Sequence, residues 1–199
     1  MDKPEINKPQ PEFLPKLKMP GFLDEILRTV LFVVVVTVLF DMAIPRSLVD
    51  GNSMQNTFQD AERLIVSRLH YLVTIPERGD IIVFNSVSAN DPDVMLIKRV
   101  IGLPGETVEF IGTQVYIDGI LVDEPYIREP CSDFNCDDDI IYLGEDEYFV
   151  MGDNRNSSND SREFGAVPID HIVGRVVFRY WPPTRLGAIQ HQDYEKLSP

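Results

Sequence analysis

Residues 115–122 read VYIDGILV, and this stretch is the clearest local guide to the fold. Asp118 and Gly119 suit the central positions of a tight reversal, and the apolar runs on either side suit strands. Similar short apolar runs recur downstream of the N-terminal 44 residues, separated by turn signals and without sustained helical periodicity. They predict strands at 63–66, 80–84, 94–101, 107–110, 115–117, 147–151 and 174–180. We therefore expect a mostly β fold, with a coiled antiparallel β-sheet domain spanning residues 45–199.

The composition excludes several classes of function. The 199-residue chain has 32 acidic and 18 basic residues, a formal net charge of -14. This charge argues against a surface that grips a phosphate backbone, so we expect no nucleic-acid partner. Three scattered histidines and two cysteines are too few for a convincing metal cluster. We expect no metal and no cofactor.

Residues 22–44 form the most apolar segment of the chain. As a helix these residues would extend about 34 Å, enough for a bilayer core of about 30 Å. Charged residues lie within two turns of its ends, at Asp24, Glu25, Arg28 and Asp41. We interpret the segment as one transmembrane anchor helix. A buried helix of a soluble protein is the alternative, and a cleaved signal peptide is disfavoured because no small-residue cleavage pattern follows.

The proline-rich residues 1–21 predict a flexible tail. Four lysines precede the anchor, whereas Arg46 alone stands immediately beyond it, a bias that places the tail in the cytoplasm. The expected protein is thus single-pass, with its large domain outside, at a plasma membrane or a thylakoid membrane. In that compartment Cys131 and Cys136 could form a disulfide, with two free thiols as the alternative.

Three segments are candidates for chemistry. Ser53 lies in the turn-rich run 50–54, Lys98 lies within an apolar strand, and a dense polar run occupies 152–162. Each also has a purely structural explanation, as a plain turn, an edge strand with a solvated lysine, or an exposed loop.

A serine hydroxyl needs a base before it attacks a carbonyl. His70, His171 and His191 all stand outside these segments, which disfavours a serine–histidine–aspartate triad. Lys98 can serve as a base if burial lowers the pKa of its amine. We expect the Ser158 hydroxyl to hold that amine toward Ser53.

Four sequence segments resemble, in order, the conserved boxes of bacterial type I signal peptidases (leader peptidases, peptidase family S26). They read GNSM at 51–54, RGDIIVF at 78–84, KRVIGLPGE at 98–106, and GDNR at 152–155 continuing to DSREFG at 160–165. The resemblance implies a membrane-bound serine endopeptidase that removes signal peptides from secreted preproteins at the outer membrane face. Its implied partners are these preproteins, the lipid bilayer and the translocation machinery.

Residue by residue, the resemblance makes Ser53 the nucleophile and Lys98 the general base, with Ser158 orienting the lysine. Supporting polar residues would be Asp153, Arg155, Asp160 and Arg162. Shallow substrate pockets that admit small side chains would be formed by Val49, Gly51, Met54, Phe58, Leu96 and Ile97. Gly51 stands where many relatives have serine, and Asn56 stands where proline is common, so the second oxyanion donor is left open.

Two other functions remain open at this stage. One is a Ser-Lys protease that cuts itself or a regulatory partner. The other is an inactive membrane-tethered β domain that binds extended peptides by strand addition. The sequence does not indicate which preproteins would be cut.

Overall fold

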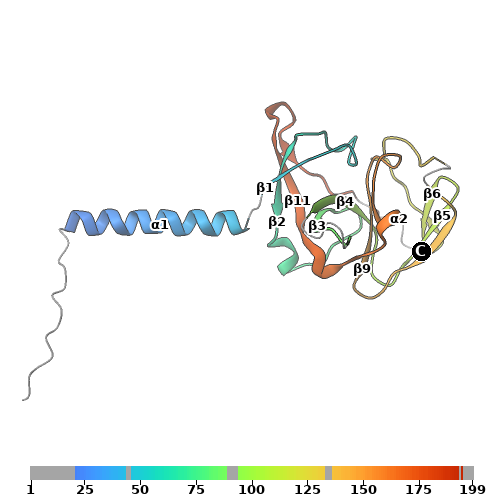
Figure 1. Cartoon of the computed structure of the whole chain (residues 1–199), viewed down its shortest axis with the longest axis horizontal. Coiled ribbons are helices and arrows are strands. Elements are labelled where there is room, and N and C mark those ends of the chain that lie inside the picture. Colours follow the sequence, from blue (N-terminus) through green and yellow to red (C-terminus); the bar gives the residue numbers. More distant parts are fainter. Residues whose placement is uncertain (1–20, 44–45, 89–93, 133–135, 193, 195–199) are drawn as a thin grey trace, which may run out of the picture. The chain divides into compact units, whose positions relative to one another are not determined.

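The computed structural model describes residues 21–43, 46–88, 94–132, 136–192 and 194 (Figure 1). Its chain divides into two units, residues 1–40 and residues 41–199. The predicted tail, 1–21, lies outside the described residues except for Gly21.

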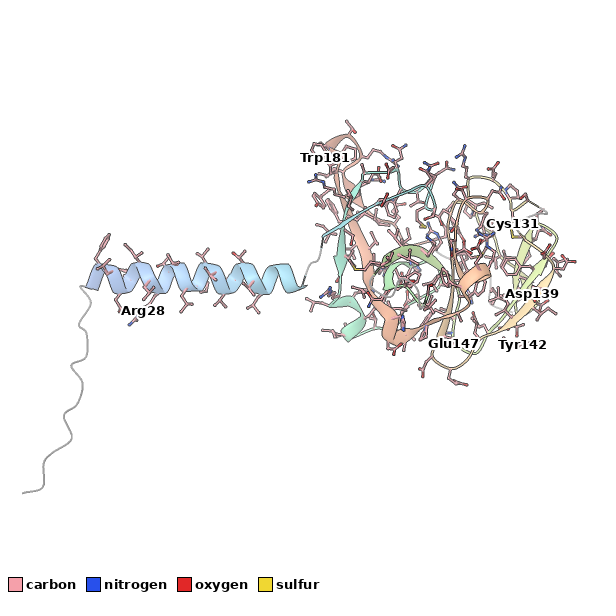
Figure 2. All side chains as sticks on the ribbon, viewed as in Figure 1. Arg28, Cys131, Asp139, Tyr142, Glu147 and Trp181 are labelled. Atoms are coloured by element: carbon pink, nitrogen blue, oxygen red, sulfur yellow. A yellow bond between two sulfur atoms is a disulfide. The ribbon has the colours of Figure 1, made fainter. Side chains whose placement is uncertain are left out.

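Helix α1 (Gly21–Ala43) occupies the segment predicted as an anchor. The hydroxyls of Thr29 and Thr37 donate to carbonyls four residues earlier, so these polar groups are satisfied within the helix. Apolar side chains around α1 are exposed (Figure 2). In the part of the chain that the structure describes, no helix has both the length and the apolar character needed to cross a bilayer.

The second unit is built from short strands, as the sequence predicts. Their bounds are β1 Arg46–Leu48, β2 Arg63–Ser67, β3 Ile81–Asn85, β4 Met95–Gly102, β5 Thr107–Ile111, β6 Gln114–Ile117, β7 Ile120–Leu121, β8 Asp139–Tyr142, β9 Glu147–Met151, β10 Val167–Pro168, β11 Ile172–Trp181 and β12 Gly187–Ala188. A short helix α2 (Ser161–Phe164) and three 3-10 turns (His70–Leu72, Ile169–His171, Pro183–Arg185) complete the described elements.

The strands form two sheets. The larger has the order β1-β2-β11-β3-β4-β9-β10, with β12 paired to β11, and the smaller has the order β7-β6-β5-β8. All the pairings are antiparallel, so the prediction of a mostly β antiparallel fold is confirmed.

The predicted hairpin is strands β6 and β7, paired at Ile117 and Ile120. Its two central residues both have positive φ, 49° at Asp118 and 77° at Gly119, as a type I′ turn requires. Inward side chains of the smaller sheet then pack on β4 and β9 in one core cluster, which includes Phe110, Ile117 and Phe149. This packing fixes the small sheet beside the loop that follows β9.

Candidate active site

Ser53 lies in the turn that follows β1. The backbone N–H of Phe58 donates to the carbonyl of Met54 at 2.8 Å, which closes the turn. Both side chains are buried in the core cluster around Leu64 and Val66. The buried side chains of Met54 and Phe58 therefore hold the turn on the core, while Ser53 itself stays partly exposed.

Lys98 lies on β4, opposite Ile82 of β3. Its side-chain nitrogen donates to Ser53 Oγ at 2.9 Å and to the carbonyl of Ile97 at 3.0 Å. The lysine is 3% exposed, so water cannot surround its charge. Fold topology thus joins two residues that are 45 positions apart in sequence.

Burial lowers the pKa of Lys98 to about 8, while the negative charges of Asp160 and Asp153 oppose this change. Water solvates an ammonium group far better than an apolar interior does, so burial favours the neutral amine. At neutral pH about one lysine in ten is then ready to accept a proton, far more than for a solvated side chain.

Asp153 follows β9 and is fully buried. The Arg99 guanidinium donates to both of its carboxylate oxygens, at 2.8 Å and 2.7 Å, and Thr57 Oγ1 donates to Oδ2. A buried carboxylate needs such charge and hydrogen-bond partners. This ion pair holds the loop after β9 against β4, beside Lys98.

Asp160 is the N-cap of α2 and accepts from the backbone N–H of Gly152 at 2.9 Å. Arg162 pairs with both of its oxygens, each at 2.8 Å. Burial would raise the pKa of Asp160, but the hydrogen bonds and charge of Arg162 with the Gly152 N–H hold it below its ordinary value. Asp160 therefore remains an anion close to Lys98.

Among the described residues Ser158 does not make the predicted hydrogen bond to Lys98, whose amine contacts Ser53 Oγ and the carbonyl of Ile97. The Ser158 hydroxyl faces Gly152 instead. It lies close enough to Asp160 to help lower that pKa. Its oxygen is buried and, among the described residues, has no hydrogen-bond partner in good geometry.

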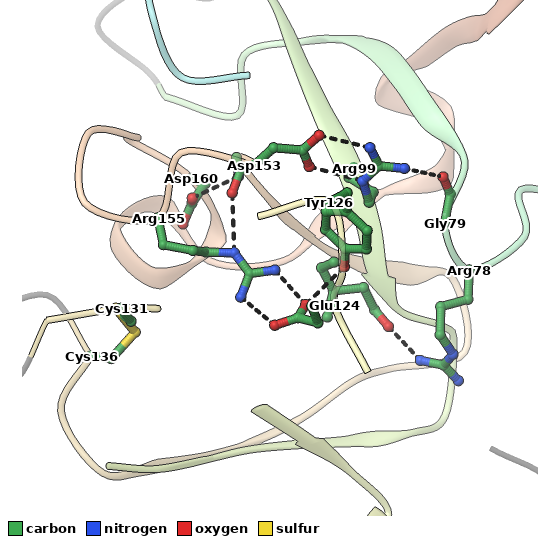
Figure 3. Close-up of polar contacts among 12 residues, drawn as sticks. Arg78, Gly79, Arg99, Glu124, Tyr126, Cys131, Cys136, Asp153, Arg155 and Asp160 are labelled. Carbon is green, nitrogen blue, oxygen red and sulfur yellow. Dashed lines mark hydrogen bonds and ion pairs between the residues drawn. A yellow bond between two sulfur atoms is a disulfide. The ribbon is translucent and has the colours of Figure 1, made fainter. Parts of the chain in front are cut away.

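Arg155 is fully buried, and its partner is Glu124, a residue that sequence reasoning misses. The carboxylate of Glu124 also accepts from the Tyr126 hydroxyl at 2.8 Å, and the Tyr126 ring lies 4.0 Å from the Arg99 guanidinium (Figure 3). Charge balance gives no signal for Glu124, because the two predicted arginines, Arg155 and Arg162, are already matched in number by two predicted carboxylates, Asp153 and Asp160.

An apolar groove of ≈ 330 Å³ ends at the two candidate catalytic residues. It is lined by Ser47, Leu48, Val49, Asp50, Ser53, Leu64, Val83, Met95, Leu96, Ile97 and Lys98. Three predicted substrate-binding residues, Val49, Leu96 and Ile97, are in this set. Met54 and Phe58 need a correction, since they are 1% and 0% exposed and form core beneath the turn. Gly51 is exposed and outside the groove lining.

The groove is a gap between two strand edges. Strand β9 pairs with β4 from Arg99 onward, so in the described part of the chain residues 95–98 have no strand partner on that side. Strand β1 is the outer edge of the larger sheet. An extended peptide placed in the gap could therefore pair with both edges.

The backbone N–H of Ser53 is a candidate donor for an oxyanion. Within the described residues, its N–H has no acceptor in the protein, while its carbonyl accepts from the N–H of Asn154 at 3.0 Å. The N–H of Gly51 is already taken by Asp60 Oδ1 at 3.0 Å. One free N–H therefore remains beside the hydroxyl, suited to an oxyanion.

Cys131 and Cys136 are joined by a disulfide. The Arg162 guanidinium donates to their sulfurs at 3.2 Å and 3.5 Å. The disulfide is thereby tied to the arginine that holds Asp160.

Comparison with known proteins gives consistent matches. Residues 23–181 match the family model described as signal peptidase, peptidase S26. A probable signal peptidase I-2 of Synechocystis is 38% identical over 144 residues, 71% of this chain and 65% of the relative. A signal peptidase I of Leptolyngbya laminosa is 42% identical over 146 residues, 71% of this chain and 70% of the relative. The crystal structure of a signal peptidase I from Enterococcus faecalis is similar, with a TM-score of 0.45, 34% identity, 52% of this chain covered and 97% of that chain.

Proposed function

This chain belongs to the signal peptidase family, peptidase S26, and we propose that it removes N-terminal signal peptides from secreted preproteins. The observation that carries the mechanism is the 2.9 Å contact between Lys98 Nζ and Ser53 Oγ at the end of an apolar groove. In this proposal Ser53 is the nucleophile and Lys98 is the general base.

The reaction proceeds through an ester on the serine. The neutral amine of Lys98 accepts the hydroxyl proton as Ser53 Oγ attacks the carbonyl carbon of the scissile peptide bond. The C–N bond then breaks, and the proton passes from the lysine to the leaving amine of the mature protein. Lys98 next takes a proton from water, whose oxygen attacks the ester. The ester C–O bond then breaks, Lys98 returns the proton to Ser53 Oγ, and the signal peptide leaves with a new C-terminal carboxyl group that ionises in water.

The free N–H of Ser53 stabilises the negative oxygen that develops during each attack. A donor aimed at this oxygen is worth about 3 kcal/mol in the transition state. Ion pairs hold the loop after β9 in place without touching the substrate. They are made by Asp153, Arg155, Asp160 and Arg162. This loop in turn holds Ser53 through the N–H of Asn154.

The substrate enters as an extended segment. Its backbone pairs with the strand edges near Asp50 and residues 95–97, and its side chains enter a groove whose floor is Leu64 and Val83. A floor of branched side chains leaves room for small residues before the cut. This geometry suits the small residues that precede signal-peptide cleavage sites.

Helix α1 attaches the enzyme to a membrane in this proposal. Large apolar side chains are exposed along it, with Phe22 at 73%, Phe32 at 68% and Leu39 at 61%. Apolar surface of this extent is unfavourable in water and favourable in lipid. The lysine bias before α1 favours residues 45–199 outside the cytoplasm, beside the translocation machinery. Because α1 alone does not have the character of a membrane span, this orientation rests on the sequence bias and not on the described helix. Extraction of cell membranes with alkaline carbonate should leave the full chain in the pellet, and its release would contradict the attachment.

The decisive experiment is cleavage of a labelled preprotein by the full chain in detergent. We expect one fragment with a new N-terminus, and we expect none from the Ser53→Ala or Lys98→Ala variants. Ser157→Ala is the matched control, because this serine is exposed and outside the groove. Undiminished cleavage by either dyad variant would refute the mechanism. Cleavage of the chain alone would indicate a self-cleaving protease, and binding without cleavage would indicate a peptide-binding domain.

A further inference from the structure

Tyr126 lies beneath the guanidinium of Arg99. The Arg99 Cζ is 4.0 Å from the centre of the ring, a distance typical of a cation held on an aromatic face. The Tyr126 hydroxyl donates to Glu124 at 2.8 Å and accepts from the Tyr194 hydroxyl at 2.7 Å. Burial, together with the charge of Glu124, raises the pKa of Tyr126 well above its ordinary value, so the hydroxyl stays protonated. The ring is thus fixed at its edge and presents its face to the arginine.

The other sides of Arg99 are fully occupied. Two of its nitrogens donate to Asp153, and Nη1 donates to the carbonyl of Gly79 at 3.0 Å. Arg99 and Asp153 are both buried, with the arginine 3% exposed and the aspartate 0% exposed. With donors used in the plane and a ring on one face, the guanidinium has no room to move away from Asp153.

The placement of Arg99 matters to the general base. Asp153 is one of two carboxylates whose charge favours the protonated form of Lys98, the other being Asp160. Arg162 neutralises Asp160, and Arg99 neutralises Asp153. If Arg99 moved away, the negative charge of Asp153 would no longer be compensated. Because both groups are buried, this charge would strongly favour the protonated form of Lys98.

We propose that Tyr126 is a positioning residue for the catalytic base: its ring holds Arg99 against Asp153 and so keeps the charge of Asp153 compensated beside Lys98. This inference rests on the proposed role of Lys98 in peptide cleavage. It assigns a task to a second residue of the loop after β7, in addition to Glu124, the partner of Arg155.

Among the described residues, few ionisable groups face Tyr126 or Lys98. Tyr126 is faced by Arg99 of β4, by Glu124 and its partner Arg155, and by Tyr194. Lys98 is faced by Ser53, Asp153 and Asp160. A change confined to the ring face of Tyr126 therefore reaches Lys98 through Arg99 and Asp153.

The test changes the charge distribution of the ring and leaves its shape alone. We would replace Tyr126 by phenylalanine and by pentafluorophenylalanine, whose fluorines reverse the attraction of the ring face for a cation. The pH dependence of kcat/KM for preprotein cleavage is then measured in detergent with the full chain. Tyr126→Phe is the reference, because both replacements lack the hydroxyl contacts to Glu124 and Tyr194 and differ from each other in the charge of the ring face. The fluorinated ring should move the midpoint of the acid limb upward by about one pH unit, lowering kcat/KM at pH 7 about tenfold with KM unchanged.

A second readout does not depend on catalysis. In a Ser53→Ala background, the ¹³Cε signal of Lys98, assigned by comparison with Lys98→Arg, reports the protonation of the amine directly. It should titrate at higher pH with the fluorinated ring than with phenylalanine. An unchanged titration would overturn the role of Tyr126 whether or not the protein cleaves preproteins. A wild-type protein that cleaves nothing while this shift is present would refute the proposed function alone.

Phe110→Leu serves as a packing control, since Phe110 is buried in the core cluster against which Tyr126 packs, whereas the ring that lies over Arg99 is that of Tyr126. It should lower the free energy of unfolding but leave the Lys98 titration where it is. An equal shift in Phe110→Leu would show that loosened packing, not the ring face, sets the protonation of the lysine.

Discussion

The amine of Lys98 lies 2.9 Å from the hydroxyl oxygen of Ser53, inside a groove wall that excludes water from the lysine. The contact joins the unpaired first half of β4 to the turn after β1. A serine and a base held at this distance need no third residue for proton transfer. Because Lys98 is kept away from water, the arrangement lowers the free energy of unfolding, and this loss can be measured.

Cleavage should increase with pH as the amine loses its proton. The pKa of Lys98, lowered by burial to about 8, sets the midpoint of the acid limb. Below it, kcat/KM should fall tenfold for each pH unit, because the neutral fraction falls by that factor. A profile from pH 6 to pH 10 with a fixed peptide substrate checks this. A midpoint near the ordinary lysine value of 10.5 would contradict a buried general base.

Lys98→Met should stabilise the protein at neutral pH while abolishing cleavage. The folded pKa, about 8, lies below the ordinary 10.5, so the unfolded chain binds more protons between these values and wild-type stability rises with pH there. At pH 7 the free energy of unfolding of the wild type is therefore about 3 kcal/mol lower than that of the methionine variant. The gain should shrink above pH 8 and vanish near pH 10.5.

Urea unfolding at pH 7 and pH 10.5 measures this difference. Arg63→Met is the control, because it removes one cation from an exposed position. Equal gains in the two variants would attribute the effect to net charge and not to the burial of Lys98.

Gly152→Ala should disable the site by steric conflict. A Cβ at this position would lie 2.5 Å from the carbonyl oxygen of Ser53 and 2.6 Å from Cβ of Ser158. Both neighbours would have to shift, which costs about 1 to 3 kcal/mol of stability and displaces the nucleophile. We expect kcat to fall at least tenfold. Gly187→Ala, with nothing within 4 Å of its added carbon, should behave like the wild type in both assays.

Local features were predictable from sequence, and contacts between distant loops were not. Asp118 and Gly119 encode their turn within four residues, so the hairpin at β6 and β7 follows from local backbone preference. The positions of β2, β3, β4, β5, β6, β9 and β11 follow from apolar runs in the same way, whereas β1, β8, β10 and β12 were not predicted. The burial of both Lys98 and Arg99 on adjacent positions of β4 contradicts simple alternation, because both faces of that strand are covered.

The outer part of the site depends on tertiary structure alone. Nothing local to Glu124 or Tyr126 indicates that they meet Arg155 and Arg99, since these contacts form only when the small sheet packs on β9. Ser158 illustrates the opposite case. The family resemblance assigns it to Lys98, whereas its conformation in this chain turns the hydroxyl toward Gly152.

Reduction of the disulfide should weaken the fold modestly. The bond joins cysteines five positions apart, and closing so short a loop stabilises a protein by about 2 kcal/mol. The double variant Cys131→Ser/Cys136→Ser should lose this amount in urea unfolding. Dithiothreitol should lower the stability of the wild type equally and leave the double variant unaffected. A fully reduced wild type with unchanged stability would contradict the prediction.

Enlarging the floor of the groove should relax its preference for small residues. Val83 lines the groove beside Leu64, and Val83→Ala removes two carbons from the space below the residue that precedes the cut. A cavity change of one or two carbons alters discrimination by about tenfold or more, so the ratio of kcat/KM for leucine over alanine at that residue should rise by this factor. Val176→Ala is the matched control, since Val176 is buried in the same core cluster but does not line the groove. Both variants should lose about 2 kcal/mol of stability, because each removes two buried carbons and leaves a cavity. An equal change of specificity in both would show that a loosened core, and not the shape of the groove, selects the substrate.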